Sequence, residues 1–296
     1  MLTINHLSKS YGDVQALRNV TLQIPTGMFG LLGPNGAGKS SLMRTIATLQ
    51  DPDSGTIVFD GVDVVNNKQQ IRRTLGYLPQ DFGVYPKVSA LDMLDHLAVL
   101  KGYVNRSQRN EVVEGLLQQV NLWEVRKRKL GTFSGGMRQR FGIAQALIGN
   151  PRLVIVDEPT AGLDPEERNR FLNLLADIGE QVVVILSTHI VEDVTDLCPR
   201  MAMICRGEVL MSGEPREAIG MMRDRVWSKM INKAALADYQ ARFTVLSSRL
   251  IGGQPLIHVY SESLPEAGFQ AVDPDLEDVY FQRLRQHGAT PTTLAA

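Results

Sequence analysis

Eight consecutive residues near the amino terminus have the types and spacing of a loop that holds a polyphosphate. They fit the pattern G-x-x-x-x-G-K-S/T as Gly33-Pro34-Asn35-Gly36-Ala37-Gly38-Lys39-Ser40. Glycines let backbone N–H groups face an anion, and the start of a following helix adds about half a unit of positive charge. Lys39 can place a full charge on the outer phosphates, and the Ser40 hydroxyl can ligate the accompanying magnesium. An apolar stretch at residues 29–32 precedes the loop and a helical stretch at residues 42–47 follows it, which favours a phosphate loop over a chance glycine-rich turn.

Two acidic residues follow a second apolar stretch. Residues 153–156 are all apolar and rich in β-branched side chains, which predicts a central parallel strand that is buried on both faces. Asp157 and Glu158 end this strand, and ligands of open α/β sheets gather at the carboxyl ends of the strands. Asp157 is therefore a candidate to reach the magnesium opposite Ser40, and Glu158 is a candidate to polarise an attacking water. Spacing along the chain does not choose between these roles.

A simpler interpretation is that the two acids only begin the next helix. Pro159 follows them at once, however, and a better helix start lies a few residues further on. There Asp164 is a candidate cap, Pro165 takes the first helical position and Glu167 takes the capping-box position. Because a phosphate loop lies upstream, we favour the catalytic interpretation of the acidic pair.

A histidine follows the next apolar stretch. Residues 182–186 predict another buried strand, and His189 comes three residues after it, at the sheet edge that carries the acidic pair. A lone histidine is more often structural than catalytic, but this position favours a hydrogen bond from His189 to a γ-phosphate. No role is assigned to His6, His96, His258 and His287, which have no comparable setting.

Composition and charge exclude several classes of protein. The chain has 296 residues, 44% hydrophobic and 21% charged, which favours one large folded domain with a smaller appendage over a disordered chain. Thirty-one basic and 32 acidic residues give a net charge of -1, so the basic surplus of a dedicated nucleic-acid binder is missing and no nucleic-acid partner is expected. Cys198 and Cys205 form no CxxC pair and are expected to be ordinary buried or idle thiols.

Membrane-spanning and secretory segments are not expected. The longest apolar stretches, residues 153–156 and 182–186, are far shorter than the roughly 18 to 20 residues that cross a bilayer as a helix. The first six residues lack the basic flank and apolar stretch of a secretory signal. We therefore expect the chain to stay in the cytosol.

The order of the elements predicts an α/β domain over residues 1–215. Short strand-like and helical stretches alternate there as in a largely parallel sheet, and residues 21–24 and 56–59 predict an antiparallel layer. Between residues 88 and 119, apolar side chains recur at three- and four-residue spacing. This predicts a helical lobe that spans about residues 88–150.

The composition changes beyond residue 215. Residues 216–296 contain two short β-like stretches, at 243–246 and 256–260, separated by glycines and a proline. They predict a small α+β appendage. Residues 288–296 are small and polar and are expected to be frayed.

Together these motifs, over residues 1 to about 215, resemble those of the ATP-binding cassette (ABC) ATPases. Five further elements carry the resemblance: the aromatic Tyr11, the glutamine loop Gly76-Tyr77-Leu78-Pro79-Gln80, the signature Thr132-Phe133-Ser134-Gly135-Gly136-Met137-Arg138-Gln139-Arg140, the D-loop Ala161-Gly162-Leu163-Asp164, and the switch histidine His189. Three positions depart from the family pattern: Phe133 replaces the usual leucine, Met137 the usual glutamine, and Ser41 the common threonine.

The resemblance implies a P-loop ATPase fold with a RecA-like parallel sheet core, an antiparallel β subdomain and a helical subdomain, to which the C-terminal appendage is added. It also implies that the chain binds ATP and Mg²⁺. The implied roles are stacking on adenine for Tyr11, phosphate binding for residues 33–41, metal binding for Ser40, Gln80 and Asp157, and hydrolysis for Glu158, His189 and Gln80.

The signature segment also has a physical interpretation that does not depend on the family. Ser134 is a candidate helix cap, and two glycines allow close approach, so a second helix start suits an anion. Because the first loop already holds one nucleotide, the second site makes sense if it serves the nucleotide of another copy. The family arrangement implies a head-to-tail dimer, expected here as a homodimer, with each ATP between Lys39 of one copy and Ser134, Gly135 and Gly136 of the other. The resemblance also implies nucleotide binding for Asp164 of the D-loop.

Most cassettes of this size resemble the motor half of a transporter, which implies a separate integral-membrane permease and a peripheral location at the cytoplasmic face of the membrane. Phe82 and Tyr85 lie where family members receive a coupling helix of that partner, and are candidates for a docking groove or for the core. Residues 275–281 resemble the terminal segment of exporter-type cassettes, including the daunorubicin-resistance class. The alternative for this segment is an amphipathic helix that docks the appendage through Leu276, Val279 and Tyr280.

Two other functions are left open. A cassette that acts on ribosomes or DNA usually has two cassettes in one chain, or a long coiled-coil insertion between the phosphate loop and the signature. Here about a hundred residues separate one phosphate loop from one signature, which leaves no room for either. The ATPase of an importer shares the same hydrolytic machinery, so the sequence motifs do not separate import from export.

Overall fold

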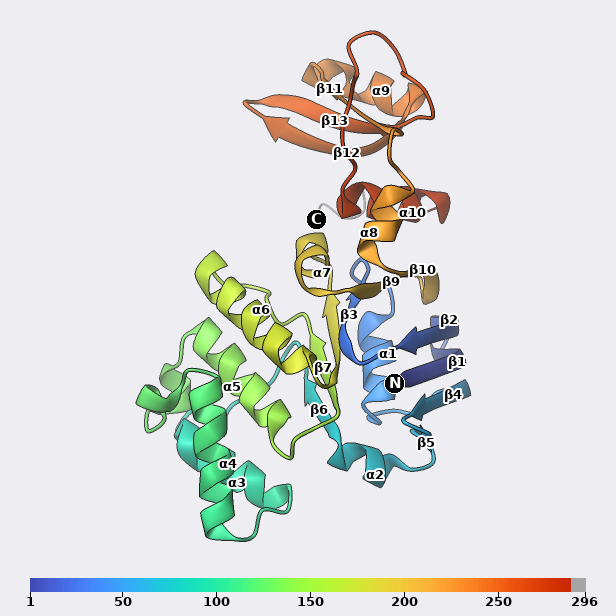
Figure 1. The fold of residues 1–296 in the computed structure, drawn as a ribbon. Helices are drawn as coiled ribbons and strands as arrows, with labels where there is room; N and C mark the ends of the chain where they lie inside the picture. The colour runs from blue at the N-terminus through green and yellow to red at the C-terminus, as the bar shows by residue number, and fades with distance from the viewer. Residues whose placement is uncertain (289–296) are drawn as a thin grey trace.

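The computed structural model describes residues 1–288 and arranges them around a six-stranded sheet (Figure 1). Its order is β10-β9-β3-β8-β7-β6, formed by β3 (Gly27–Leu32), β6 (Leu75–Leu78), β7 (Leu153–Asp157), β8 (Val183–Thr188), β9 (Arg200–Cys205) and β10 (Glu208–Gly213). Every neighbouring pair is parallel except the β9–β10 hairpin. The two buried parallel strands that the sequence predicts are thus confirmed as β7 and β8.

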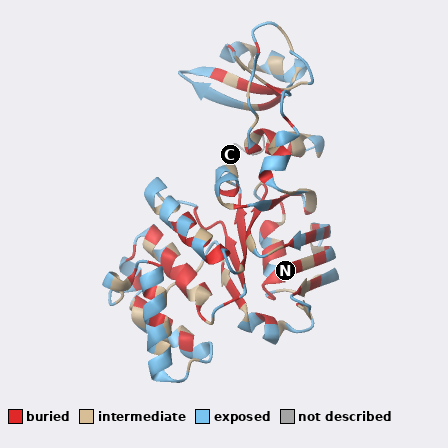
Figure 2. Cartoon of the chain, in the orientation of Figure 1, coloured by how far each residue is buried: buried red, intermediate tan, exposed pale blue. Residues whose placement is uncertain are grey.

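Strand β7 is buried on both faces, because its side chains point alternately into two apolar clusters. Val154 and Val156 pack into one apolar cluster, and Leu153 and Ile155 pack into another. The first cluster joins the sheet to the helices on one side, and the second joins it to the antiparallel layer on the other. Figure 2 shows these central strands as a continuous buried band. Their carboxyl ends are therefore held in fixed positions relative to each other.

The predicted antiparallel layer is also confirmed. It has the order β2-β1-β4-β5, with β1 (Leu2–Tyr11), β2 (Val14–Ile24), β4 (Ser54–Phe59) and β5 (Val62–Asp63). Helix α1 (Lys39–Ile46) buries Leu42 and Met43 in the cluster that this layer shares with the parallel sheet. Helix α2 (Lys68–Arg73) follows the layer and leads into β6.

The helices predicted after residue 88 form as α3 (Ala90–Leu100) and α4 (Arg106–Gln119). Ser89 and Asn105 cap them, each accepting a hydrogen bond from the backbone N–H three residues on. Two 3₁₀ turns, η1 (Trp123–Val125) and η2 (Leu130–Thr132), lead to α5 (Gly135–Leu147), and α6 (Pro165–Gly179) follows β7. In Figure 1 these four α-helices lie together on one side of the parallel sheet.

The remaining elements build a second, smaller sheet. After α7 (Val191–Leu197) and α8 (Pro215–Gly220), four strands pair in the order β12-β13-β11-β14. They are β11 (Val226–Met230), β12 (Thr244–Ile251), β13 (Gln254–Tyr260) and β14 (Gln270–Ala271), accompanied by η3 (Lys233–Ala235), α9 (Leu236–Arg242) and α10 (Leu276–Gln286). Pro255 was expected to interrupt a β-like stretch but lies within β13.

Helix α10 returns to the main body of the protein and packs against α7 and α8 (Figure 1). Its apolar residues Leu276, Val279, Tyr280 and Leu284 are buried in the same cluster as strands of the parallel sheet. Residues 275–281 therefore form the amphipathic docking helix that the sequence allows. Helix α10 belongs to the C-terminal region but is buried in the core of the main body. A domain boundary near residue 215 therefore stays a prediction. Of the stretch expected to be frayed, residues 289–296 lie outside the described residues.

Within residues 1–288, no helix is both long enough and apolar enough to cross a membrane. Cys198 and Cys205 are both free and buried, as expected.

Candidate functional site

The phosphate loop joins the end of β3 to the start of α1. Gly38 is the N-cap of α1 with φ at 104°, in the left-handed region, and a Cβ there would lie 2.5 Å from the carbonyl oxygen of Ala16. Among the described residues no side chain caps this helix end, so its first N–H groups stay available to an anion. The strand, loop and helix order that the sequence predicts is thus present as an open cradle.

Lys39 lies across this cradle. Its Nζ atom is 2.6 Å from the Gly33 carbonyl oxygen, 3.2 Å from that of Pro34 and 3.2 Å from Oε1 of Glu158. The side chain is only 6% exposed, and burial lowers its pKa while Glu158 opposes the shift. A buried cation is therefore held where the outer phosphates of a nucleotide would need it.

Asp157 brings an unsatisfied oxygen to the same sheet edge. It ends β7 opposite Ser187 of β8, and both side chains are buried. Within residues 1–288, neither Oδ1 of Asp157 nor Oγ of Ser187 has a hydrogen-bond partner. Burial raises the pKa of the Asp157 carboxyl. A buried carboxylate oxygen is a donor that Mg²⁺ prefers, so Asp157 fits the metal site predicted for it together with Ser40 and Gln80.

Glu158 has an unusual backbone conformation. Its φ is 49°, in the left-handed region, which costs a non-glycine residue on the order of 1–3 kcal/mol. Its N–H donates to the Ser187 carbonyl oxygen over 2.9 Å, and its carboxylate lies between two side chains. Oε2 is 2.7 Å from Nδ1 of His189, while Oε1 faces Lys39. The structure thus brings the predicted acid and histidine into direct contact.

A cavity of about 570 Å³ lies over the phosphate loop. It is lined by residues 34–41, Gln80 and Glu158, together with Val14, Gln15, Ala16, Arg18 and Arg206. Gln80, which follows β6, is therefore brought to the phosphate loop as predicted. Tyr11 is not among the lining residues; it is exposed at the end of β1 and its hydroxyl donates to Oε1 of Gln50 over 2.6 Å.

Arg206 is a lining residue that the sequence analysis missed. It lies in the turn between β9 and β10, next to Gly207, whose N–H donates to the Ala37 carbonyl oxygen over 2.8 Å. One Arg206 nitrogen donates to the Gly288 carbonyl oxygen over 3.1 Å, just beyond α10. The Arg-Gly pair between two apolar stretches indicates a turn, but only the fold places that turn beside the phosphate loop.

The signature segment lies apart from this cavity. Ser134 caps α5 by accepting a hydrogen bond from the Met137 N–H over 3.2 Å, as predicted, and both Ser134 and Gly135 are exposed. None of the signature residues lines the cavity over the phosphate loop. Within one copy, the structure does not bring the two anion-suited helix starts together.

Tight packing fixes the signature against its neighbours. A Cβ at Gly136 would lie 2.3 Å from Oε2 of Glu167 in α6. Asp164 caps α6, as predicted, by accepting from the Glu167 N–H over 2.9 Å. Phe133, the departure from the usual leucine, is buried and meets Phe141 edge to face at 6.4 Å between ring centroids. Phe133 therefore fills the core, and the exposed Gly135 and the buried Gly136 keep the family's residue types.

The two aromatic residues considered for partner docking have different settings. Phe82 is half-buried and packs against the main apolar cluster, which favours the core role that the sequence left open for it. A Cβ on Gly142 would touch its ring, which shows how closely α5 covers it. Tyr85 is 65% exposed.

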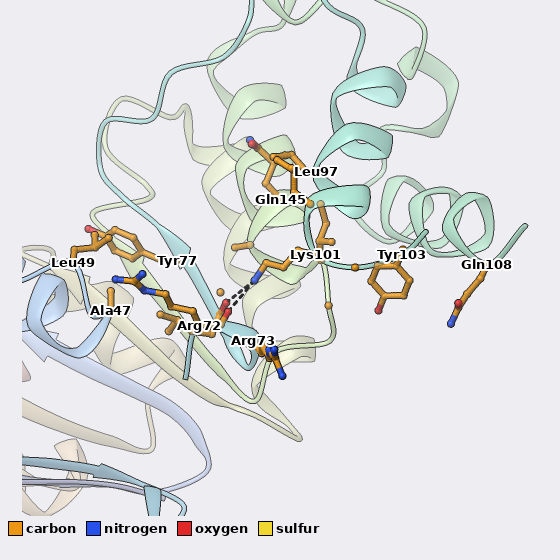
Figure 3. A pocket seen from close by; sticks show the side chains of 17 residues that line it. Ala47, Leu49, Arg72, Arg73, Tyr77, Leu97, Lys101, Tyr103, Gln108 and Gln145 are labelled. Carbon is orange, nitrogen blue, oxygen red and sulfur yellow. Dashed lines mark hydrogen bonds between the residues drawn. The ribbon is translucent and has the colours of Figure 1, made fainter. Parts of the chain in front are cut away.

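A larger cavity of about 910 Å³ is bounded by the ends of α1 and α2 on one side and by α3 and α5 on the other (Figure 3). The lining includes exposed Leu49 and Leu100, and the basic residues Arg72, Arg73 and Lys101. Nζ of Lys101 donates to two backbone carbonyl oxygens, those of Arg72 and Leu75, each over 3.2 Å. The lining contains no acidic residue.

Comparison with known proteins gives matches over the residues that build both helix starts. The family model described as ABC transporter matches residues 17–161. The chain is 35% identical to the linearmycin resistance ATP-binding protein LnrL of Bacillus subtilis (strain 168), over 72% of this chain and 69% of the relative. It is 36% identical to the methionine import ATP-binding protein MetN of Bordetella pertussis, over 80% of this chain and 68% of the relative.

Solved structures agree with these sequence matches. A dimeric post-hydrolysis state of the ATP-binding cassette MJ0796, bound to ADP and Pi, superposes with a TM-score of 0.66 at 28% sequence identity. The match covers 72% of this chain and 98% of that chain.

Proposed function

The chain belongs to the ABC transporter ATP-binding family, and we propose that it is the ATP-hydrolysing subunit of an ABC-2-type exporter. Membership makes it an ABC ATPase subunit of a transporter. Export is supported by the likeness to a resistance protein and by residues 275–281, although the apolar residues of that segment also serve to dock α10. The similar likeness to a methionine import protein makes import the second candidate.

The geometry supports a division of roles within one copy. The loop N–H groups and Lys39 bind the phosphates of ATP, which draws Lys39 away from the Gly33 carbonyl and from Glu158. Glu158, held in place by Nδ1 of His189, then accepts a proton from the attacking water. The protonated Glu158 donates to Nδ1, so that Nε2–H of His189 donates a hydrogen bond to the γ-phosphate. When bound by Ser40, Asp157 and Gln80, magnesium supplies positive charge beside the outer phosphates.

One observation carries the proposal of an ATP-dependent dimer. The helix start at Lys39 lies within a cavity, whereas the helix start at Ser134 and Gly135 is exposed and lines no part of it. Because this second anion site faces solvent, it can bind the ATP held in the phosphate loop of another copy. ATP thus joins two chains head to tail. Loss of the γ-phosphate removes a group that both copies bind, and the dimer opens.

Size-exclusion chromatography with light scattering tests this arrangement. Glu158→Gln blocks hydrolysis while leaving the phosphate loop intact, so ATP and magnesium should convert this variant from monomer to dimer. Adding Ser134→Arg places a bulky side chain at the exposed helix start and should keep the chain monomeric. A Glu158→Gln chain that stays monomeric with ATP and magnesium would contradict the dimer.

We further propose that the chain sits at the cytoplasmic face of a membrane, bound to a separate permease. The lining of the larger cavity offers such a partner the exposed apolar side chains of Leu49 and Leu100. The basic residues Arg72, Arg73 and Lys101 lie in the same lining (Figure 3). Its position next to β6, which leads to Gln80, gives the partner a route to the nucleotide site.

Purification from detergent extracts tests the partner. Recovery of an integral-membrane protein with the chain supports transport, and loss of that protein on Leu100→Glu places the contact in the cavity. Association that RNase or DNase removes would instead support a cassette that acts on ribosomes or DNA. Inside-out membrane vesicles that contain the complex test the direction of transport. When ATP is added outside, an exporter accumulates its substrate inside these vesicles.

A further inference from the structure

One buried carboxylate has no role in the division of residues given above. Asp193 lies in the first turn of α7 and is 0% exposed. Three side chains donate to it: Thr160 over 2.9 Å, Thr188 over 3.3 Å, and Arg168, whose Nε is 2.9 Å from Oδ1. A second Arg168 nitrogen lies 2.7 Å from the same oxygen. The charge of Asp193 is thus paired with Arg168, while its other oxygen accepts from two hydroxyl groups.

Each donor belongs to a segment that holds a residue of the proposed site. Thr160 comes two residues after Glu158, at the beginning of the turn that leads to Asp164. Thr188 ends β8 and immediately precedes His189. Arg168 lies in the first turns of α6, the helix that Asp164 caps. The Asp193 carboxylate therefore accepts hydrogen bonds from the segment that carries Glu158 and from the segment that carries His189.

These connections matter because the Glu158 segment is not held by an ordinary backbone conformation. With φ at 49°, Glu158 needs outside contacts to keep its position, and its N–H bond to Ser187 supplies one of them. The hydrogen bond from Thr160 to Asp193 supplies another, two residues later. On the histidine side, Thr188 donates to Asp193 and accepts from the Ile190 N–H over 2.9 Å, so both neighbours of His189 are held by one hydroxyl.

We propose that Asp193 is a positioning residue for hydrolysis, which sets the distance between Glu158 and His189 and links both to the D-loop at Asp164. This inference rests on the proposed ATPase function. Asp193 does not touch the nucleotide cavity and acts through the residues beside it. Removing its charge should therefore slow the chemical step without weakening nucleotide binding.

The first experiment compares Asp193→Asn with Glu192→Gln in the full chain. Asparagine keeps the shape and one acceptor oxygen but loses the charge that faces Arg168. Glu192 is the matched control, because it is 78% exposed and also lies within 3.5 Å of Arg168. A displacement of about 1 Å can cost about a hundredfold in rate, so kcat should fall by up to that factor in Asp193→Asn. The affinity for a fluorescent ATP analogue should stay within about twofold, and Glu192→Gln should match the wild type in both.

A double-variant cycle distinguishes positioning from a structural role. If Asp193 acts through Glu158, single-turnover hydrolysis in Glu158→Gln should not slow further when Asp193→Asn is added. Rate losses that multiply, or a parallel loss of nucleotide affinity, would overturn the positioning role. If Asp193→Asn does not fold, Thr160→Val replaces it, with Thr195→Val, on the exposed side of α7, as its control. Equal kcat for these two threonine variants would overturn the proposal as well.

The outcomes also separate this inference from the proposed function. A wild-type chain that hydrolyses ATP at the same rate as Asp193→Asn overturns the positioning role alone. A wild-type chain that binds no ATP and hydrolyses none overturns the ATPase function, and the positioning role with it.

Discussion

Nδ1 of His189 and Oε2 of Glu158 lie 2.7 Å apart, although 30 residues and a complete helix separate the two positions along the chain. The contact exists because β7 and β8 are adjacent parallel strands, so their carboxyl ends meet at one edge. On its other side, the same carboxylate is 3.2 Å from Lys39. Glu158 is thus placed between the residue proposed to bind phosphate and the residue proposed to orient it.

The first prediction concerns the rate of hydrolysis. Replacing Glu158 with glutamine removes the proton acceptor but keeps the contacts with His189 and the backbone. A positioned base contributes about a hundred- to ten-thousandfold, so kcat should fall by that order in a phosphate-release assay. Glu180→Gln, an exposed change at the end of α6, should keep wild-type turnover. Turnover within twofold of the wild type in Glu158→Gln would assign the base to another residue.

The second prediction concerns Lys39. Lys39→Ala removes the buried cation from the cradle and should reduce ATP turnover to the background rate and weaken ATP binding in calorimetry. The circular dichroism spectrum should not change, because the polar contacts of the Lys39 side chain within residues 1–288 are with two loop carbonyls and Glu158. Lys68→Ala, which breaks the surface pair with Asp51, is the control. Undiminished turnover in Lys39→Ala would require a different nucleotide site.

The third prediction concerns acid stability of the C-terminal sheet. Lys229, Tyr239 and Arg242 hydrogen-bond to Glu266 and lower its pKa from its ordinary value of 4.5 to about 2. The folded pKa lies below the unfolded one, so this contact stabilises the fold above pH 4.5 and is lost as the pH falls towards 2. Urea midpoints measured across this range should fall less steeply for Glu266→Gln than for the wild type. The exposed change Glu262→Gln should leave the slope unchanged, and equal slopes for all three chains would contradict the prediction.

The fourth prediction concerns the two thiols. Burial raises the pKa of Cys198 to about 12, and burial also raises that of Cys205. Since the thiolate is the reactive form, iodoacetamide at pH 8 should modify neither cysteine in the native chain. Mass spectrometry after labelling in denaturant should show both modified. Rapid native labelling of either residue would show that its strand or helix opens readily.

The fifth prediction concerns α10. Leu284 is 1% exposed within the core that α10 shares with the larger unit. Leu284→Ala should lower the free energy of unfolding by about 2–5 kcal/mol, measured by urea denaturation. Arg283 lies on the same helix and is half-exposed, so Arg283→Ala should lower the free energy of unfolding by less than about 1 kcal/mol. Similar costs for the two variants would mean that α10 docks weakly.

Local features of the site could be predicted from the sequence. The phosphate loop and the caps Ser134 and Asp164 each depend on residues within a few positions of each other, so spacing along the chain fixes their geometry. The strand at residues 153–156 could be predicted because a buried parallel strand needs an unbroken apolar run.

Features that join distant segments could not be predicted in this way. Asp193 is one acid among several in a short helix, and its burial depends on donors from three other segments. The sequence left Phe82 open between the surface and the core, because nothing near it in sequence reveals that α5 covers its ring. The left-handed backbone of Glu158 depends in turn on the register of β7 with β8.

The hydrogen bond from Arg206 to Gly288 connects the far end of the described chain to the lining of the cavity over the phosphate loop. Because the Gly207 N–H beside it donates to the Ala37 carbonyl oxygen, two hydrogen bonds connect the end of α10 to the phosphate loop. Since α10 also contacts β12, a displacement of the small sheet would reach the phosphate loop over a short path.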